Sequence, residues 1–243
     1  MCGGRNNKRK CLQLDHSTWT NHSSLNVARV GHSTVTTKSA TFLFGGIYSR
    51  KTFEYLLNGS NIWLMGKKEI PGNGFYAGCA IAIKSEEEIL LIGGLDTQDR
   101  ILSFNIKDHT FRELQTRLNV GRVGNRCAFI PKTKKVMITG GCYLNSTEIL
   151  DTESESIINS NPLNSKRCNH GMGILTVDGE DKLVTYGGEN NGYINTVEIY
   201  NTQTEEWETT DIKLKVPRAV FGFLTVKLDT IIPGLQYCRY KKI

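Results

Sequence analysis

Two histidines that follow an arginine at the same spacing are the residues that most resemble metal ligands. His32 lies three residues after Arg29, and His170 lies three residues after Arg167. Imidazole nitrogens are common ligands of transition metals. The equivalent positions of other segments hold Asn125 and Phe221. A position that accepts such different side chains imposes no ligand chemistry, so we predict structural histidines and no metal site.

Three glutamates also share one position in successive segments of the chain, Glu54, Glu148 and Glu198. Paired carboxylates can act as general acid and base. Because each of these glutamates belongs to a different segment, we expect each to be buried and to accept hydrogen bonds within its own unit. The sequence therefore predicts no catalytic residue.

A recurring pair of glycines marks these segments. The pairs begin at residues 3, 45, 93, 140 and 187, at intervals of 42 to 48 residues. Neither a G-x-x-x-x-G-K-[ST] motif nor a following helical pattern accompanies them, so a phosphate-binding loop is not indicated. Glycine is needed where a turn has positive φ or where two backbones approach closely. A fixed period of this length predicts one supersecondary unit that is stacked repeatedly.

Each unit reads as four short strands joined by polar turns. An apolar run precedes each of the last four glycine pairs, for example Ile89–Ile92, and an aromatic residue such as Trp63 or Trp207 follows later in the unit. Asp178-Gly179 between two apolar runs is a strong hairpin signal. Helical periodicity is absent. A four-stranded sheet cannot bury both faces alone, so the units must pack against one another.

Composition excludes several classes of function. The 243 residues carry a net charge of +6, and their basic runs are short and scattered, whereas nucleic-acid binding requires basic residues gathered on one face. No apolar run approaches the roughly 18 residues of a membrane span. No apolar segment follows the charged N-terminus, so no signal peptide is visible. We therefore expect neither a nucleic-acid nor a membrane partner.

The seven cysteines are odd in number and contain no C-x-x-C pair. This pattern suggests neither a zinc site nor a disulfide framework. Cys79 and Cys127 lie in apolar runs and are interpreted as buried small hydrophobes. A reducing compartment, and so a cytoplasmic localisation, fits best; a signal peptide upstream of Met1 would instead indicate secretion.

The recurring landmarks resemble those of the kelch repeat. These are Arg-x-x-His, or Arg-x-x with Gly or Asn, an apolar hairpin that ends in Gly-Gly, and Val-Glu-x-Tyr-Asn-x-x-Thr-x-x-Trp. Asn195–Trp207 is the fullest copy of the last motif, and the resemblance covers almost the whole chain. It implies an all-β fold, a kelch-type β-propeller with one four-stranded blade per repeat around a central channel. Ser103 in place of the glutamate, Phe111 and Ile157 in place of tryptophan, and Pro233-Gly234 in place of the last glycine pair depart from the pattern.

One domain, residues 1–243, is expected. Its four complete blades span about 29–74, 75–121, 122–166 and 167–216, between half-units at 1–28 and 217–243. The N-terminal half-unit supplies outer strands and the C-terminal one supplies inner strands. Pairing of Ala219–Val226 with Cys11–Asp15 would close a five-bladed ring; otherwise the chain is a fragment of a propeller with six or more blades.

The resemblance to the kelch repeat implies two classes of function, an enzyme or a protein-interaction module. Enzymes like galactose oxidase carry kelch-type blades, but their copper site needs a histidine, a tyrosine and a tyrosine crosslinked to cysteine. The adjacent Tyr237-Cys238 pair is a poor candidate, so we expect no enzyme activity and no cofactor. The resemblance instead implies a monomeric protein-interaction module. It is similar to the substrate-recognition propeller of kelch-like ubiquitin-ligase adaptors or, alternatively, to an actin-associated kelch protein.

Partner contacts in this family often come from residues just after Gly-Gly and just after the arginine that opens a repeat. Loops held by a rigid scaffold commonly carry recognition. The matching positions, which we predict to bind a protein or peptide partner, are Arg5, Asn7, Tyr48, Asp96, Tyr143, Asn145, Asn190 and Tyr193, with Val30, Val123, Arg126 and Asn169.

Overall fold

All regular structure in the described part of the chain is β. The computed structural model describes residues 2–15, 18–83, 87–177 and 180–219. Four antiparallel sheets of four strands each follow one another along the chain, after a two-stranded N-terminal hairpin. The predicted all-β propeller fold is confirmed.

The strands follow the repeat in order. The N-terminal hairpin pairs β1 (Cys11–Asp15) with β2 (Thr18–His22). The first blade contains β3 (Ser33–Thr36), β4 (Ala40–Phe44), β5 (Phe53–Leu57) and β6 (Leu64–Met65). The second contains β7 (Cys79–Ile83), β8 (Glu88–Ile92), β9 (Ile101–Asn105) and β10 (Phe111–Glu113). The third contains β11 (Arg126–Ile130), β12 (Lys135–Gly141), β13 (Leu144–Asp151) and β14 (Ile157–Ser160). The fourth contains β15 (Gly171–Val177), β16 (Glu180–Tyr186), β17 (Thr196–Asn201) and β18 (Glu206–Lys213).

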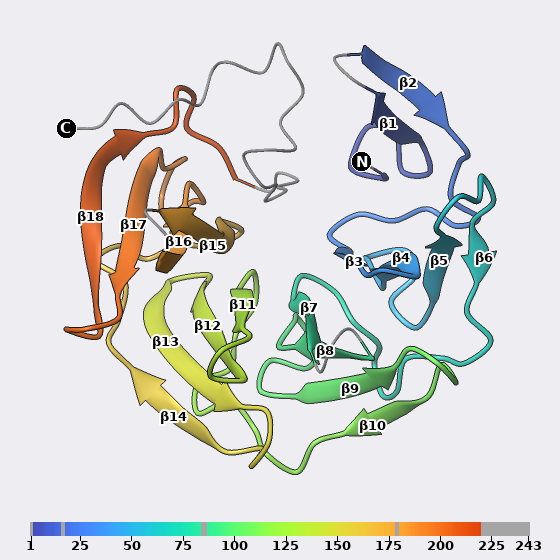
Figure 1. Cartoon of the computed structure of the whole chain (residues 1–243). Coiled ribbons are helices and arrows are strands. Elements are labelled where there is room, and N and C mark those ends of the chain that lie inside the picture. Colours follow the sequence, from blue (N-terminus) through green and yellow to red (C-terminus); the bar gives the residue numbers. More distant parts are fainter. Residues whose placement is uncertain (1, 16–17, 84–86, 178–179, 220–243) are drawn as a thin grey trace.

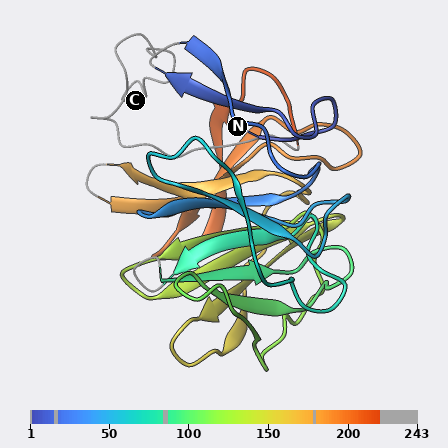
Figure 2. The same cartoon turned by 90° about the vertical axis from the view of Figure 1, so that its right-hand side faces the viewer.

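The blades are arranged around a central axis. Figure 1 shows β3, β7, β11 and β15 nearest the axis and β6, β10, β14 and β18 at the outer rim. The innermost strands of consecutive blades contact one another, β3 with β7, β7 with β11, and β11 with β15. Figure 2 shows the same ring from the side. Of the predicted closing strand, only Ala219 belongs to the described residues, and the Asp178-Gly179 turn lies outside them.

The apolar core lies between blades, as stacking requires. Phe42, Phe44 and Phe53 of the first blade share one buried cluster with Phe104 of the second. The ring of Phe104 lies 5.1 Å from that of Phe44 and 5.0 Å from that of Phe53. The predicted tryptophans also pack between units. Trp63 contacts the cluster of Cys11 and Leu25, and Trp207 belongs to the cluster of Ala128 and Met137.

The glycine pairs are the joints between units. The first glycine of each pair has a φ between 59° and 70°. A Cβ on Gly45 would lie 1.8 Å from the carbonyl oxygen of Phe75, and one on Gly140 would lie 2.5 Å from that of Arg167. The N–H of the second glycine donates to these same carbonyl oxygens, from Gly46 and Gly141, at 3.0 Å. Glycine is therefore required both by the turn and by the close approach of the next unit.

The register of the second blade corrects one prediction. Glu54 pairs with Leu43, which lies two residues before its glycine pair, and Leu102 pairs with the equivalent Leu91. Leu102, not Ser103, therefore occupies the glutamate position. The Val-Glu-x-Tyr-Asn motif agrees with this register, because Ile101–Asn105 aligns with Val197–Asn201 and places Leu102 on Glu198.

The prediction of no disulfide framework is wrong. Three disulfides join Cys2 to Cys11, Cys79 to Cys127, and Cys142 to Cys168, with Cα separations of 4.0, 6.0 and 4.4 Å. Cys79 and Cys127 meet because they lie on β7 and β11, the innermost strands of neighbouring blades. The seventh cysteine, Cys238, lies outside the described residues.

Candidate interaction face and its scaffold

The loops after the glycine pairs and the linkers that enter each blade lie together at one end of the blades. Backbone hydrogen bonds join each such loop to the linker beside it, for example from Ile47 N–H to Val30 O at 2.9 Å and from Cys142 N–H to Val123 O at 2.7 Å. We call this side of the ring the loop face. The loop face lies on the right-hand side of Figure 2.

Buried ion pairs hold the loop face in three of the four blades. Arg29 pairs with Glu54, Arg122 with Glu148, and Arg167 with Glu198, and all six side chains are fully buried. In each pair, arginine Nε donates to glutamate Oε1 at 3.0 Å. Each guanidinium also donates to the carbonyl oxygen of the first glycine of its blade, at 2.6 to 2.7 Å. The predicted role of the three glutamates, as buried hydrogen-bond acceptors within their own blades, is confirmed.

The glutamates also hold the linkers. Their Oε2 atoms accept the backbone N–H groups of Asn26, Asn119 and Asn164, at 2.6 to 2.7 Å. These asparagines were not among the residues predicted from the sequence. An asparagine three residues before the repeat-opening arginine, after a leucine, was the available signal. The buried carboxylates thus bind the partly buried backbone at the start of each linker and tie it to the blade.

The histidine position serves packing. His170 is fully buried, and its Nε2 lies 2.9 Å from the Thr139 hydroxyl. Burial, with the neighbouring Arg126 and Arg167 cations, lowers the pKa of His170 well below its usual value. Burial and the Arg29 cation lower the pKa of His32 to about 4. Among the described residues, no three His, Cys, Asp or Glu side chains are grouped closely enough to hold a metal ion.

Seven of the predicted partner-binding residues have exposed side chains, namely Arg5, Asn7, Tyr48, Asp96, Tyr143, Asn190 and Tyr193. The exposed fractions of the three tyrosines are 60%, 78% and 68% for Tyr48, Tyr143 and Tyr193. Tyr143 has a φ of 68°, which is unusual for a residue other than glycine. Asp96 forms an ion pair with Arg50. The structure therefore brings these side chains to one face of the ring, on different blades.

The other five predicted residues mainly serve the scaffold. Val30 and Val123 are half-buried and accept backbone hydrogen bonds from the neighbouring loops. Asn145 Nδ2 donates to the Leu163 carbonyl at 3.0 Å, and Asn169 Nδ2 donates to Glu189 at 2.9 Å. Arg126 is partly buried and donates to the Asn125 carbonyl. Burial lowers the pKa of Arg126 to about 10 and raises that of the nearby Tyr186 to about 12. These contacts leave the three polar side chains less available to a partner.

The segment Lys8-Arg9-Lys10, one of the short basic runs, is exposed and belongs to the loop face. The Nζ atom of Lys8 lies 4.3 Å from the centre of the Tyr48 ring. The two residues are forty positions apart, so only the stacking of the N-terminal hairpin unit on the first blade brings them together. Their places in the loops that follow the first two glycine pairs were the available signal.

Comparisons with known proteins agree with this geometry. Residues 166–210 match the family model of the kelch motif. A kelch repeat-containing protein of Dictyostelium discoideum is 26% identical over 155 residues, which are 58% of this chain and 22% of that protein's length. The chain thus spans about a fifth of the curated relative that it matches.

Two solved structures share the fold at low identity. YjhT is 14% identical, with a TM-score of 0.72 over 87% of this chain and 79% of that one. A fungal alcohol oxidase of the AA5 family, in complex with copper, is 16% identical, with a TM-score of 0.68 over 89% of this chain and 51% of that one. These likenesses show the fold alone. The kelch match in the fourth blade and the kelch repeat-containing relative, together with the recurring glycine pairs, support a kelch-repeat β-propeller.

Proposed function

We propose that this chain binds a protein or peptide partner through its loop face, as a monomeric propeller. The kelch-repeat propeller as a class fits a protein-interaction module. Here, the repeated buried groups are used by the scaffold, and the loops differ in sequence from blade to blade. Recognition by variable loops on a rigid frame is the general use of such an architecture.

The observation that carries the proposal is the placing of exposed aromatic residues. Among the described residues, four aromatic side chains are strongly exposed, and Tyr48, Tyr143 and Tyr193 all belong to the loop face; the fourth, Trp19, lies on β2. Tyrosine is frequent among the residues that dominate binding energy, because it supplies a large contact area with little conformational entropy to lose.

The test is affinity capture with matched variants of the chain. One variant combines Tyr48→Ala, Tyr143→Ala and Tyr193→Ala, and its control combines Leu57→Ala, Ile62→Ala and Ile158→Ala, which are exposed elsewhere on the blades. Quantitative mass spectrometry should find proteins that are retained by the wild type and the control and lost by the tyrosine variant. Equal retention by both variants would contradict the proposal.

Two more specific roles rest on resemblance to kelch-like proteins. In the first, the bound partner is a substrate that a cullin-type ubiquitin ligase modifies; in the second, the partner is actin. Co-sedimentation with filamentous actin separates them, because only the second role predicts that the tyrosine variant pellets less than the control.

We also propose that the chain is not an oxidase, although the fungal alcohol oxidase has a similar fold. Fold similarity leaves the chemistry open. Copper-loaded protein is expected to release no hydrogen peroxide from a primary alcohol, and turnover would overturn this part of the proposal.

The cellular compartment of the protein is a separate question, on which the sequence and the structure point in different directions. The cytoplasmic localisation expected from the cysteine pattern conflicts with the three disulfides, which favour an oxidising environment. Described residues form no helix that could cross a membrane. Fractionation of cells, together with thiol labelling of the isolated protein, would decide between the two environments.

A further inference from the structure

We propose that the segment Arg5–Lys10, here called the basic loop, is a docking site for a short acidic segment of the protein partner. This inference rests on the proposed function and adds the chemistry of the ligand. Arg5, Lys8, Arg9 and Lys10 supply four positive charges, and the segment contains no acidic residue. It is the N-terminal counterpart of the loops that follow the glycine pairs of the four blades.

The backbone of the basic loop is held at both ends and in the middle. The Cys2–Cys11 disulfide closes it, and Gly3 N–H donates to the Lys10 carbonyl at 2.9 Å. The linker into the first blade fixes its centre, because Arg29 N–H donates to the Lys8 carbonyl at 2.8 Å. A loop that is already ordered loses little conformational entropy when a ligand binds.

The charges of the basic loop are not neutralised within the described residues. None of its four cations forms an ion pair with an acidic side chain there, and all four side chains are exposed. Elsewhere on the loop face, Arg50 pairs with Asp96, and Arg100 pairs with Glu113. An unpaired cluster of cations on one part of a face attracts a complementary anionic group.

The shape around the basic loop also suits a peptide. An open depression of about 450 Å³ is lined by residues 6–10 together with Ala28. Lys8 reaches from its edge to the ring of Tyr48, so a cationic surface continues directly into an exposed aromatic one. A peptide that places carboxylates on the lysines can therefore pack an apolar neighbour on the tyrosine.

The rest of the loop face argues for a short acidic peptide rather than a nucleic acid. A nucleic acid would extend its phosphates beyond the basic loop and across the face. Acidic side chains follow the glycine pairs of the second and fourth blades, at Asp99 and Glu189, and Arg50 is already paired with Asp96. These would repel an extended polyanion, whereas an acidic peptide of a few residues stays within the basic loop.

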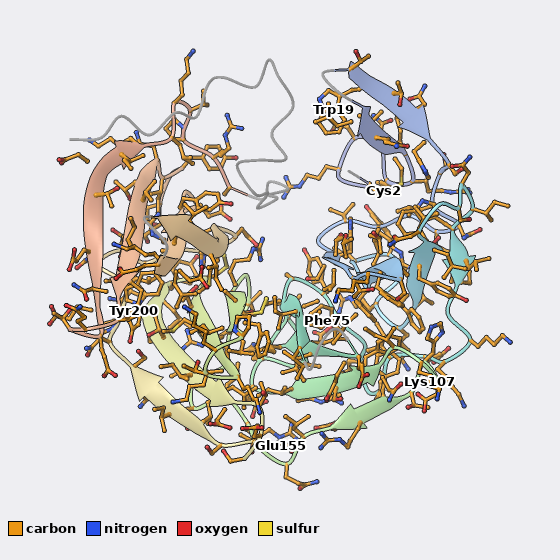
Figure 3. The ribbon with its side chains drawn as sticks, viewed as in Figure 1. Cys2, Trp19, Phe75, Lys107, Glu155 and Tyr200 are labelled. Carbon is orange, nitrogen blue, oxygen red and sulfur yellow. A yellow bond between two sulfur atoms is a disulfide. The ribbon has the colours of Figure 1, made fainter. Side chains whose placement is uncertain are left out.

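Fluorescence anisotropy with a labelled hexaglutamate peptide tests the proposal. The variant Lys8→Glu/Lys10→Glu should bind at least about tenfold more weakly than the wild type, because two attractions become repulsions. The control Lys107→Glu/Lys132→Glu makes the same charge change in turns away from the loop face and should differ less than about twofold. Figure 3 shows Lys107 at the outer rim, far from Cys2.

Three results would overturn the proposal. The first is that hexaglutamate shows no saturable binding below about 1 mM. The second is that both charge-reversed variants lose the same amount of affinity for hexaglutamate, and the third is that a single-stranded oligonucleotide of equal charge binds more tightly than hexaglutamate. The uncharged variant Lys8→Gln/Lys10→Gln should lie between the wild type and the reversed variant, which guards against misfolding. Failure of all these expectations leaves the tyrosine-dependent capture experiment intact, so the two proposals are tested separately.

Discussion

The second blade builds the same joint as the other three without their buried ion pair. Where the first, third and fourth blades hold arginine and glutamate, the second holds Phe75 and Leu102, and both belong to one apolar cluster. Phe75 keeps the backbone role of the arginine, since its carbonyl accepts the N–H of Gly46 at 3.0 Å. Figure 3 shows Phe75 near the middle of the ring.

The linker explains this exchange. In the three charged blades, the glutamate accepts the N–H of a linker asparagine such as Asn119. The linker before the second blade is one residue longer. The residue that follows its buried Ile70, as Asn26 follows Leu25, is Pro71, which has no N–H to donate. A buried carboxylate in this blade would therefore lack one hydrogen-bond donor. The apolar side chains of Phe75 and Leu102 need no such donor. The comparison teaches that the buried charges and the linker N–H groups form one scaffold unit.

The largest predicted effect comes from breaking one ion pair on one side only. Glu198→Leu leaves the buried Arg167 cation without its counter-ion and removes the acceptor of the Asn164 N–H, so the free energy of unfolding should fall by about 3–5 kcal/mol. The matched change in the apolar blade, Leu102→Met, should cost less than about 1.5 kcal/mol. Urea denaturation of both variants measures the difference, and similar losses would remove the distinction between the blades.

A smaller effect concerns the position that holds His32 in the first blade and Asn125 in the third. The pKa of His32 in the folded chain is about 4, because burial disfavours the imidazolium, against 6.5 when exposed. The unfolded chain therefore takes up a proton first, and stability present above pH 6.5 is lost as the pH falls towards 4, by at most about 3 kcal/mol.

Replacement of His32 by the residue of the third blade tests this account. His32→Asn should lose less stability than the wild type between pH 6.5 and 4, as followed by thermal melts across that interval. Parallel pH profiles for the two proteins would show that His32 does not titrate as its burial requires.

The smallest effect separates the scaffold from the loop face. Tyr143 is 78% exposed and has a φ of 68°. In Tyr143→Gly, relief of this conformation and the greater entropy of an unfolded glycine oppose each other, so the free energy of unfolding should change by less than about 1 kcal/mol. Partner capture should still weaken. A variant that instead unfolds like Glu198→Leu would place Tyr143 in the scaffold.

Much of the scaffold was predictable from the sequence, because its requirements are local. Glycine pairs mark turns with positive φ, and apolar runs before them mark strands. The position of Leu102 was predictable as well, but from the motif rather than from the glycine pair. The distance from the second glycine to the glutamate varies, at eight residues in the first blade, seven in the third and ten in the fourth, whereas Ile101–Asn105 aligns residue by residue with Val197–Asn201. The strand register gives the same position.

Features that depend on contact between units were missed. The Cys79–Cys127 disulfide requires β7 and β11 to be neighbours, and the contact of Lys8 with Tyr48 requires two loops to lie side by side. Neither pairing leaves a pattern within one unit. The exposed members of the candidate face were predicted from their places after the glycine pairs, whereas the structural use of Asn145 and Asn169 emerged only from their hydrogen bonds.

A double-mutant cycle on Arg122 and Glu148 tests most directly the claim that these buried charges form a scaffold unit. Arg122→Met and Glu148→Leu should each lower the free energy of unfolding by about 3 kcal/mol or more, because each leaves a buried charge unpaired. The double variant, which approaches the apolar arrangement of the second blade, should lose at least about 2 kcal/mol less than the sum of the two. Losses that simply add would contradict the account.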